Sequence, residues 1–215
     1  MGKHIGLYSN KTAYKQDGNL LVPNVSLLSD DGTLVYNQSE DFVDLGLPSG
    51  LLWDKKNLGA TNQEDAGQYF SWANIVGHPS SDTFTQNVYN QTEGKNLQWN
   101  IGKDNDAARA ILGKPWRMPS KADFQELMSN CDSEWTSING KNGRKFTSKI
   151  NGNSIFLPAA GFVGDGGLGN FGIDGYYWSS PFNTNGSAWR LGFYDGGVGM
   201  GSSSRSYGLS VRAVQ

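Results

Sequence analysis

The chain has 215 residues, a formal net charge of -2 at pH 7, 18% charged residues, 29 glycines and 12% aromatic residues. The lack of a basic excess argues against nucleic-acid binding as a main activity. Many glycines together with many aromatic residues favour short strands and loops around one core over a helical bundle.

Cysteine and histidine usage excludes several kinds of site. Cys131 is the single cysteine, so neither an intrachain disulfide nor a cysteine metal cluster can form. His4 and His78 lie far apart without companions at ligand spacing, which argues against a histidine-based catalytic or zinc site. We therefore expect no catalytic residue, no metal and no cofactor.

Two further segment types are missing from the sequence. No apolar run reaches the roughly 20 residues that span a bilayer. The first residues also lack the apolar stretch of a secretory signal, so either the protein does not use a standard signal or a leader has been removed. We expect no membrane span.

Residues 1–40 contain short apolar runs, with a hairpin-like turn at residues 29–32. This segment is too small for a core of its own. We expect an N-terminal extension that packs on the main domain or on a partner subunit, where it would support attachment or homo-oligomerisation.

The pattern changes at residue 41. Residues 42–47 and 51–53 predict strands on either side of a Pro-Ser-Gly turn. Residues 63–73 predict a helix, because Ala66, Tyr69, Phe70 and Ala73 fall on one helical face behind acidic residues in the first turn. The polar residues 79–103 predict a long loop.

Two further helices follow. Residues 104–113 predict a short helix with an Asp or Asn N-cap and Gly113 at its end. A second helix is expected to begin after Ser120, with Asp123 completing a weak capping box. Cys131 falls on the apolar stripe of this helix, so we expect a small core residue and not a nucleophile.

Short strands are expected next, at residues 135–138, 144–149 and 154–158. Asn-Gly pairs at 139–140, 142–143 and 151–152 predict the turns between them. Residues 164–169 are glycine-rich, but no helical pattern and no Lys-Ser/Thr pair follows, so a surface loop is expected and not a phosphate cradle.

The last forty residues alternate large apolar residues with small or polar ones. Residues 189–193 and 198–200 predict two half-buried strands joined at the Asp195–Gly196 turn, and residues 209–214 predict a closing strand. Every lysine and glutamate precedes this region. Because outward glycines cost stability and add no packing, two interpretations stand: a surface loop with ordinary turn chemistry, or a face kept for contact with a ligand.

The order of several motifs from residue 41 to 215 resembles the Fibrobacter major paralogous domain family. The motifs are Phe42–Leu47 with Trp53, GQYFSW at 67–72, WRMPS at 116–120, LPAAG at 157–161, GYYWSS at 175–180 and GLSVR at 208–212. The resemblance implies an α+β, C-type-lectin-like fold of the formylglycine-generating-enzyme-like branch. In that fold, two or three helices surround short antiparallel strands and many loops.

Within that branch, residues of about 176–207 look like the variable region of a diversity-generating retroelement protein. Adenine miscopying in such systems converts asparagine codons into codons that include Gly, Ser, Asp, Tyr and Arg but never Lys, Glu, Gln, Met or Trp. Trp189 and Met200, which are of forbidden types, lie on the apolar phase. The resemblance implies a ligand-binding face made of residues of permitted types: Arg190, Gly192, Tyr194, Asp195, Gly196, Gly197, Gly199, Gly201, Ser202, Ser203, Ser204, Ser206 and Tyr207.

The implied function is binding to a protein or cell-surface receptor, on a phage virion or a bacterial cell surface. A phage tropism role would imply a trimer attached through residues 1–40. The alternative is a non-variable surface adhesin or assembly module of the same fold. Enzymatic oxidation of cysteine, known in this fold, needs reactive cysteines, and calcium-dependent sugar binding needs triplets such as Glu-Pro-Asn; both are missing from this sequence.

Overall fold

The computed structural model describes residues 42–81, 105–184 and 186–215 with their side chains, and the backbone of four two-residue strands before them. The chain divides into two compact units, Met1–Asp41 and Phe42–Gln215. In the first unit, β1 (Lys15–Gln16) pairs with β2 (Asn19–Leu20). β3 (Leu27–Leu28) pairs with β4 (Leu34–Val35), and the turn predicted at residues 29–32 lies outside the described residues. The predicted loop at 79–103 lies almost entirely outside the described residues.

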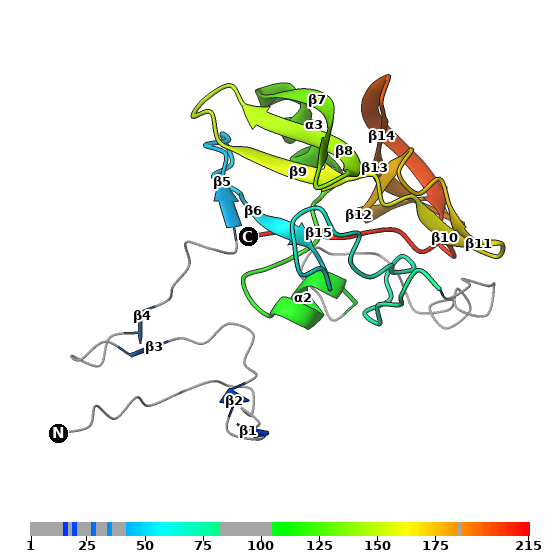
Figure 1. The fold of residues 1–215 in the computed structure, drawn as a ribbon, viewed down its shortest axis with the longest axis horizontal. Helices are drawn as coiled ribbons and strands as arrows, with labels where there is room; N and C mark the ends of the chain where they lie inside the picture. The colour runs from blue at the N-terminus through cyan, green and yellow to red at the C-terminus, as the bar shows by residue number, and fades with distance from the viewer. Residues whose placement is uncertain are drawn as a thin grey trace. The chain divides into compact units, whose positions relative to one another are not determined.

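The second unit is an assembly of small antiparallel sheets (Figure 1). β5 (Phe42–Asp44), β6 (Leu52–Asn57) and β15 (Arg212–Val214) form one sheet, and β7 (Cys131–Ile138), β8 (Lys141–Ser148) and β9 (Ser154–Pro158) form another. β10 (Phe162–Gly164) and β11 (Gly167–Gly169) pair as a hairpin, which corrects the surface loop predicted at residues 164–169: only residues 165–166 connect the two strands. β12 (Gly175–Thr184), β13 (Ser187–Tyr194) and β14 (Gly197–Ser204) form the last sheet. The predicted α+β class is confirmed at this coarse level.

Both helices of the described residues begin where the capping residues predict. α2 (Ala107–Leu112) starts after Asp106, whose carboxylate accepts from the backbone N–H of Arg109 at 3.0 Å, and Gly113 ends it. α3 (Lys121–Asn130) starts after Ser120, and the reciprocal Ser120 and Asp123 bonds complete the capping box. None of the described helices is long and apolar enough to cross a membrane.

The helix predicted over residues 63–73 is wrong. The segment forms turns and an extended stretch, in which Tyr69 bridges His78 and Phe70 bridges Leu209. Tyr69 and Phe70 are both buried but join different clusters, so the apolar residues serve two sides of an extended chain and not one helical face. Gly67 has φ 72°, and a Cβ there would lie 2.4 Å from the Leu58 carbonyl oxygen, so this left-handed bend also interrupts a helix.

The Asn-Gly pairs give two turns and not three. Asn139–Gly140 joins β7 to β8, and Gly152 has the positive φ of a turn before β9. Asn142–Gly143 lies inside β8, which corrects the prediction. A Cβ on Gly143 would lie 2.5 Å from the Phe156 ring, so this glycine provides close packing between strands.

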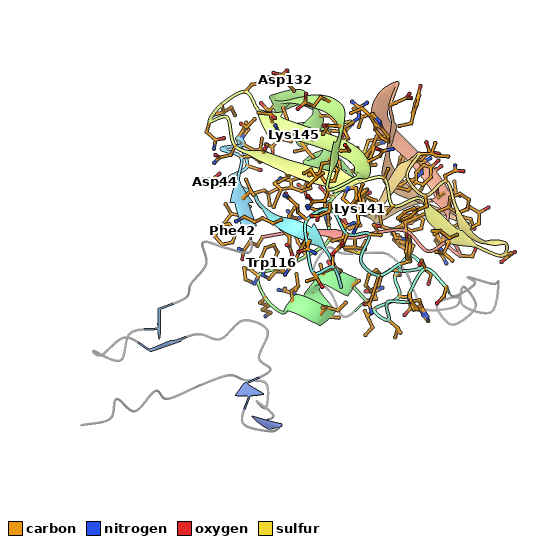
Figure 2. All side chains as sticks on the ribbon, in the orientation of Figure 1. Phe42, Asp44, Trp116, Asp132, Lys141 and Lys145 are labelled. Carbon is orange, nitrogen blue, oxygen red and sulfur yellow. The ribbon has the colours of Figure 1, made fainter. Side chains whose placement is uncertain are left out.

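The largest core cluster lies between α3 and the sheets. Trp53 stacks obliquely on Phe124 of α3 at 5.6 Å, and Tyr177 stacks on Phe193 at 5.9 Å. A second cluster holds Trp72 and Trp178, whose indole N–H groups donate to backbone carbonyls at 3.0 and 2.7 Å. Side chains fill the space between the sheets, while Asp132 and Lys145 lie at the outer surface of the β7–β8 pair (Figure 2).

Residues 209–214, which the alternation predicts as one closing strand, are buried on both sides. Every residue from 209 to 214 is buried, although only Arg212–Val214 is strand β15. Arg212 is fully inaccessible to solvent and donates five hydrogen bonds. The C-terminal segment is therefore part of the core, although β15 is an outer strand of its sheet, beside β6.

Cys131 caps the end of α3 and begins β7, with 4% of its surface exposed. Burial raises the pKa of this thiol to about 11, and alkylating reagents attack the thiolate. We expect iodoacetamide at pH 8 to leave the native chain unlabelled over an hour and to label it in urea, as measured by intact mass. Rapid native labelling would contradict the burial of Cys131.

Candidate ligand-binding face

The β13–β14 hairpin divides its residues between two faces. The two strands pair in continuous register from Ser187↔Ser204 to Tyr194↔Gly197, with the predicted turn at Asp195–Gly196. Partners in an antiparallel pair share a face, and successive residues alternate. The register therefore assigns every position of the hairpin to one side.

One face packs inward. Leu191 and Phe193 are buried in the core cluster, and Val198 and Met200 pack against it. The start of α3 covers the far end of this face, where Lys121 Nζ lies 3.3 Å from the centre of the Trp189 ring. The predicted apolar phase is the inward face of the sheet.

The opposite face carries the small and polar residues that alternate with the apolar ones. We call it the Arg190 face. It holds these predicted residues: Arg190, Gly192, Tyr194, Gly197, Gly199, Gly201 and Ser203. Tyr194 is 53% exposed, and nothing lies within 4 Å of a Cβ added at Gly199. The glycines leave the backbone accessible beside a long charged side chain.

The remaining predicted residues lie elsewhere on the hairpin or after it. Asp195 and Gly196 form its exposed turn. Ser202 and Ser204 are exposed but lie on the inward-facing side of β14, beyond the core. Ser206 and Tyr207 follow β14, and Tyr207 is 37% exposed. The structure thus brings together a subset of the predicted residues and not the whole set.

Three neighbours hold the Arg190 guanidinium in place. It lies 4.3 Å from the centre of the Tyr176 ring, and its Nε donates to Ser203 Oγ at 2.8 Å. Its Nη1 occupies the space above Gly192, where an added Cβ would lie 1.8 Å away. Among the described residues, neither Nη has a hydrogen-bond acceptor within reach. This leaves a planar donor group that is fixed in position and available to a ligand.

Arg190 is charged despite its half-buried position. Burial lowers the pKa of Arg190, while Tyr176 and the Asp174 carboxylate raise it. Asp174 itself accepts from the Tyr176 hydroxyl at 2.9 Å and from Asn170 at 2.6 Å. An arginine keeps its proton under such shifts, so the face presents a positive charge.

An aromatic row continues this face, and the sequence did not single out its inner members. Phe162 meets Tyr176 edge-on at 6.0 Å and stacks on Tyr207 at 5.2 Å. Tyr176 pairs with Gly192 in the β12–β13 register, which explains how it comes to support Arg190. The signal that could have identified Tyr176 is its position in the GYYW motif.

Arg144 of β8 fixes the turn of the hairpin from below. Its Nη2 donates to the carbonyl oxygens of Tyr194 and Asp195 at 2.8 and 3.1 Å, and its Nη1 donates to Ser133 Oγ at 3.0 Å. Arg144 is 6% exposed, and burial lowers its pKa. The position of the turn therefore depends on a neighbouring sheet.

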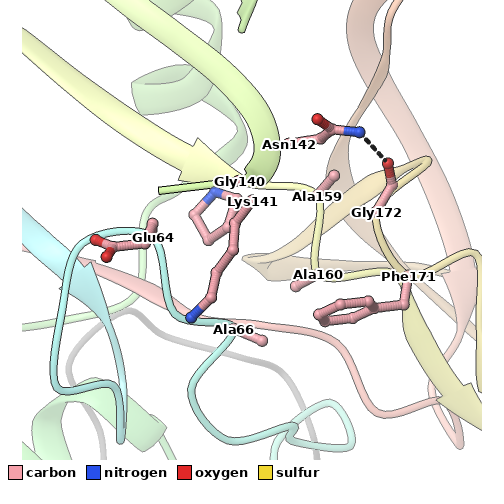
Figure 3. Close-up of a pocket in the computed structure, with 10 residues that line it drawn as sticks. Glu64, Ala66, Gly140, Lys141, Asn142, Ala159, Ala160, Phe171 and Gly172 are labelled. Carbon is pink, nitrogen blue, oxygen red and sulfur yellow. Dashed lines mark hydrogen bonds between the residues drawn. The ribbon is translucent and has the colours of Figure 1, made fainter. Parts of the chain in front are cut away.

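A shallow pocket of about 100 Å³ lies away from the hairpin (Figure 3). Glu64, Lys141, Asn142 and Phe171 are among its lining residues. Their polar groups already have partners: Glu64 accepts from Asn139, Lys141 pairs with Asp65, and Asn142 donates to the Gly172 carbonyl oxygen at 3.0 Å. These bonds join neighbouring segments of the chain, so the three side chains already have structural partners.

In the described part of the chain, no three His, Cys, Asp or Glu side chains come close enough to hold a metal ion.

A family model described as a domain of unknown function (DUF8237) matches residues 131–214. No curated protein and no solved structure matches the chain. The matched residues run from β7 to β15 and include the whole Arg190 face.

Proposed function

We propose that this chain is a non-enzymatic display protein that binds a protein or cell-surface ligand through the Arg190 face. Its scaffold would be a C-type-lectin-like fold, similar to the Fibrobacter major paralogous domain and to the variable proteins of diversity-generating retroelements. A phage virion or a bacterial surface would be its place of action, with residues 1–40 as an attachment or oligomerisation segment.

The observation that carries the proposal is the division of labour in the β13–β14 hairpin. Core residues such as Leu191 and Phe193 alternate with residues on the opposite face, where a Cβ added at Gly199 would meet nothing within 4 Å. Exposed substitutions away from caps and special backbone positions usually change stability by within about 0.5 kcal/mol. Rigid aromatic and arginine anchors among small residues are also the composition of binding loops.

Two matched libraries of the full chain test this proposal. One randomises Tyr194, Gly199, Ser203 and Tyr207; the other randomises Leu191, Phe193, Val198 and Met200. We expect most members of the first library to resist protease and few of the second, because large-to-small core changes cost about 2–5 kcal/mol each. Equal losses in both libraries would refute a display role for this face.

The gene's surroundings separate the two candidate forms of the function. A neighbouring reverse transcriptase, with a near-repeat of the coding end that reads asparagine at the variable positions, would support the retroelement form. A locus without either would leave a non-variable adhesin or assembly module that uses the same face.

A further inference from the structure

No other strand of the described residues pairs with the outer edge of β14. In the sheet order β12–β13–β14, strand β14 pairs only with β13, and it is the outermost strand of its sheet in Figure 1. Among the described residues, the backbone groups of residues 198–203 make no hydrogen bond outside the β13 ladder. Every second N–H and C=O of this strand therefore points away from the sheet.

The usual devices that protect an edge are missing from β14. Its sequence, GVGMGSSS, contains no lysine, no other charged residue and no proline, and its eight residues pair without a bulge. Such an edge is a template for an additional strand. Main-chain hydrogen bonds would supply affinity there, and side chains would supply selectivity.

The Arg190 guanidinium extends toward this edge. Arg190 stands opposite Gly201, and its Nη1, which lies above Gly192 of β13, would be 3.4 Å from a Cβ on Gly201 of β14, so the guanidinium lies over both strands. An added strand would lie about 4.8 Å further out. Because Gly199 and Gly201 have no side chains, a carboxylate on the outward face of that strand could reach the unoccupied Nη groups.

We propose that the β14 edge binds an extended segment of the protein partner as a fourth strand, with an Asp or Glu of that segment paired to Arg190. The inference rests on the proposed function, since it names the ligand chemistry of the same face. On the inward side, the added strand would meet Val198 and Met200, which are only partly buried. The segment should therefore alternate apolar residues with polar ones, one of them acidic.

Self-association is a poorer fit to this edge. Two copies joined through β14 would place two Arg190 guanidinium groups on one face with no carboxylate between them. The β14 strand of a second copy would also supply no carboxylate to Arg190, because it contains no acidic residue. An extended, acidic partner segment would supply both main-chain hydrogen bonds to the β14 edge and a carboxylate to Arg190.

An mRNA-displayed library of random dodecapeptides, selected on the whole chain, tests the inference. We expect enrichment of alternating peptides with an acidic residue. Their affinity should fall at least tenfold for Arg190→Gln and change less than twofold for Lys145→Gln, which removes a positive charge from the exposed side of β8. Single N-methyl groups along a selected peptide should abolish binding at every second position, because only alternate amides face β14.

Other outcomes would overturn the inference. Peptides that depend on Arg190 but show no alternation in the N-methyl scan bind through side chains alone, which refutes the added strand and leaves the proposed function standing. If the selected peptides contain no acidic residue, or if none of them loses affinity with Arg190→Gln, the pairing of a partner carboxylate with Arg190 is refuted. A dimer by light scattering that Met200→Glu dissociates would mean that a second copy occupies the edge. Failure of the outward library described above would instead count against the proposed function.

Discussion

Replacing Arg212 by methionine is expected to lower the free energy of unfolding by at least about 3 kcal/mol. The side chain is completely buried, and its three nitrogens donate to Asn57 Oδ1 and to the carbonyl oxygens of Asp54, Lys55 and Phe156 at 2.8–3.0 Å. Methionine fills similar volume but makes none of these five hydrogen bonds, and hydrogen bonds from charged donors contribute about 1.5–3 kcal/mol each. Urea unfolding followed by tryptophan fluorescence measures the loss.

Arg117→Met is the matched control for this experiment. Arg117 makes a charged hydrogen bond with Asp123 at 2.6 Å, but its side chain is 22% exposed. A partly exposed pair of this kind contributes about 1 kcal/mol or less. If Arg212→Met does not fold, Arg212→Lys, which keeps the charge but loses the planar fork, gives the comparison. Equal losses for Arg212 and Arg117 variants would contradict a central role for Arg212.

Replacing Arg144 by methionine is expected to loosen the turn of the binding hairpin and to cost about 2 kcal/mol overall. Hydrogen bonds to charged donors are worth about 1.5–3 kcal/mol, and Arg144 donates to the carbonyl oxygens of both Tyr194 and Asp195. Hydrogen exchange at the amides of residues 194–197 should accelerate by about tenfold, more than in α3, because local opening precedes global unfolding there.

Lys145→Met, one position along β8, is the control for Arg144. Lys145 Nζ lies 3.6 Å from Glu134, and both side chains are largely exposed, so its replacement should leave exchange at the turn unchanged. An Arg144 variant that loses stability evenly, without faster exchange at residues 194–197, would show that Arg144 supports the sheet and not the turn.

The sequence correctly predicted those elements that depend only on residues close together in the chain. The Asp195–Gly196 turn and the alternation around it predicted the hairpin, because turn type and period two are properties of adjacent residues. Ser120 and Asp123 predicted the start of α3 for the same reason: a capping box closes within one turn of chain.

Predictions failed where distant segments decide the outcome. Residues 63–73 satisfy a helical pattern, yet Tyr69 and Phe70 are drawn to different clusters by residues more than ninety positions away. Asn142–Gly143 has the composition of a turn but lies under Phe156 of the next strand. Propensity is a weak prior that tertiary packing overrides.

The sequence by itself determined which residues of the C-terminal hairpin are apolar and which are small, since that division is written in its alternation. Only the tertiary structure decided that Ser202 and Ser204 lie on the side away from Arg190, that Tyr176 and Ser203 hold its guanidinium, and that Arg212 is buried. Strand register and the order of strands in a sheet depend on contacts between segments far apart in the chain, and alternation within one strand does not specify them.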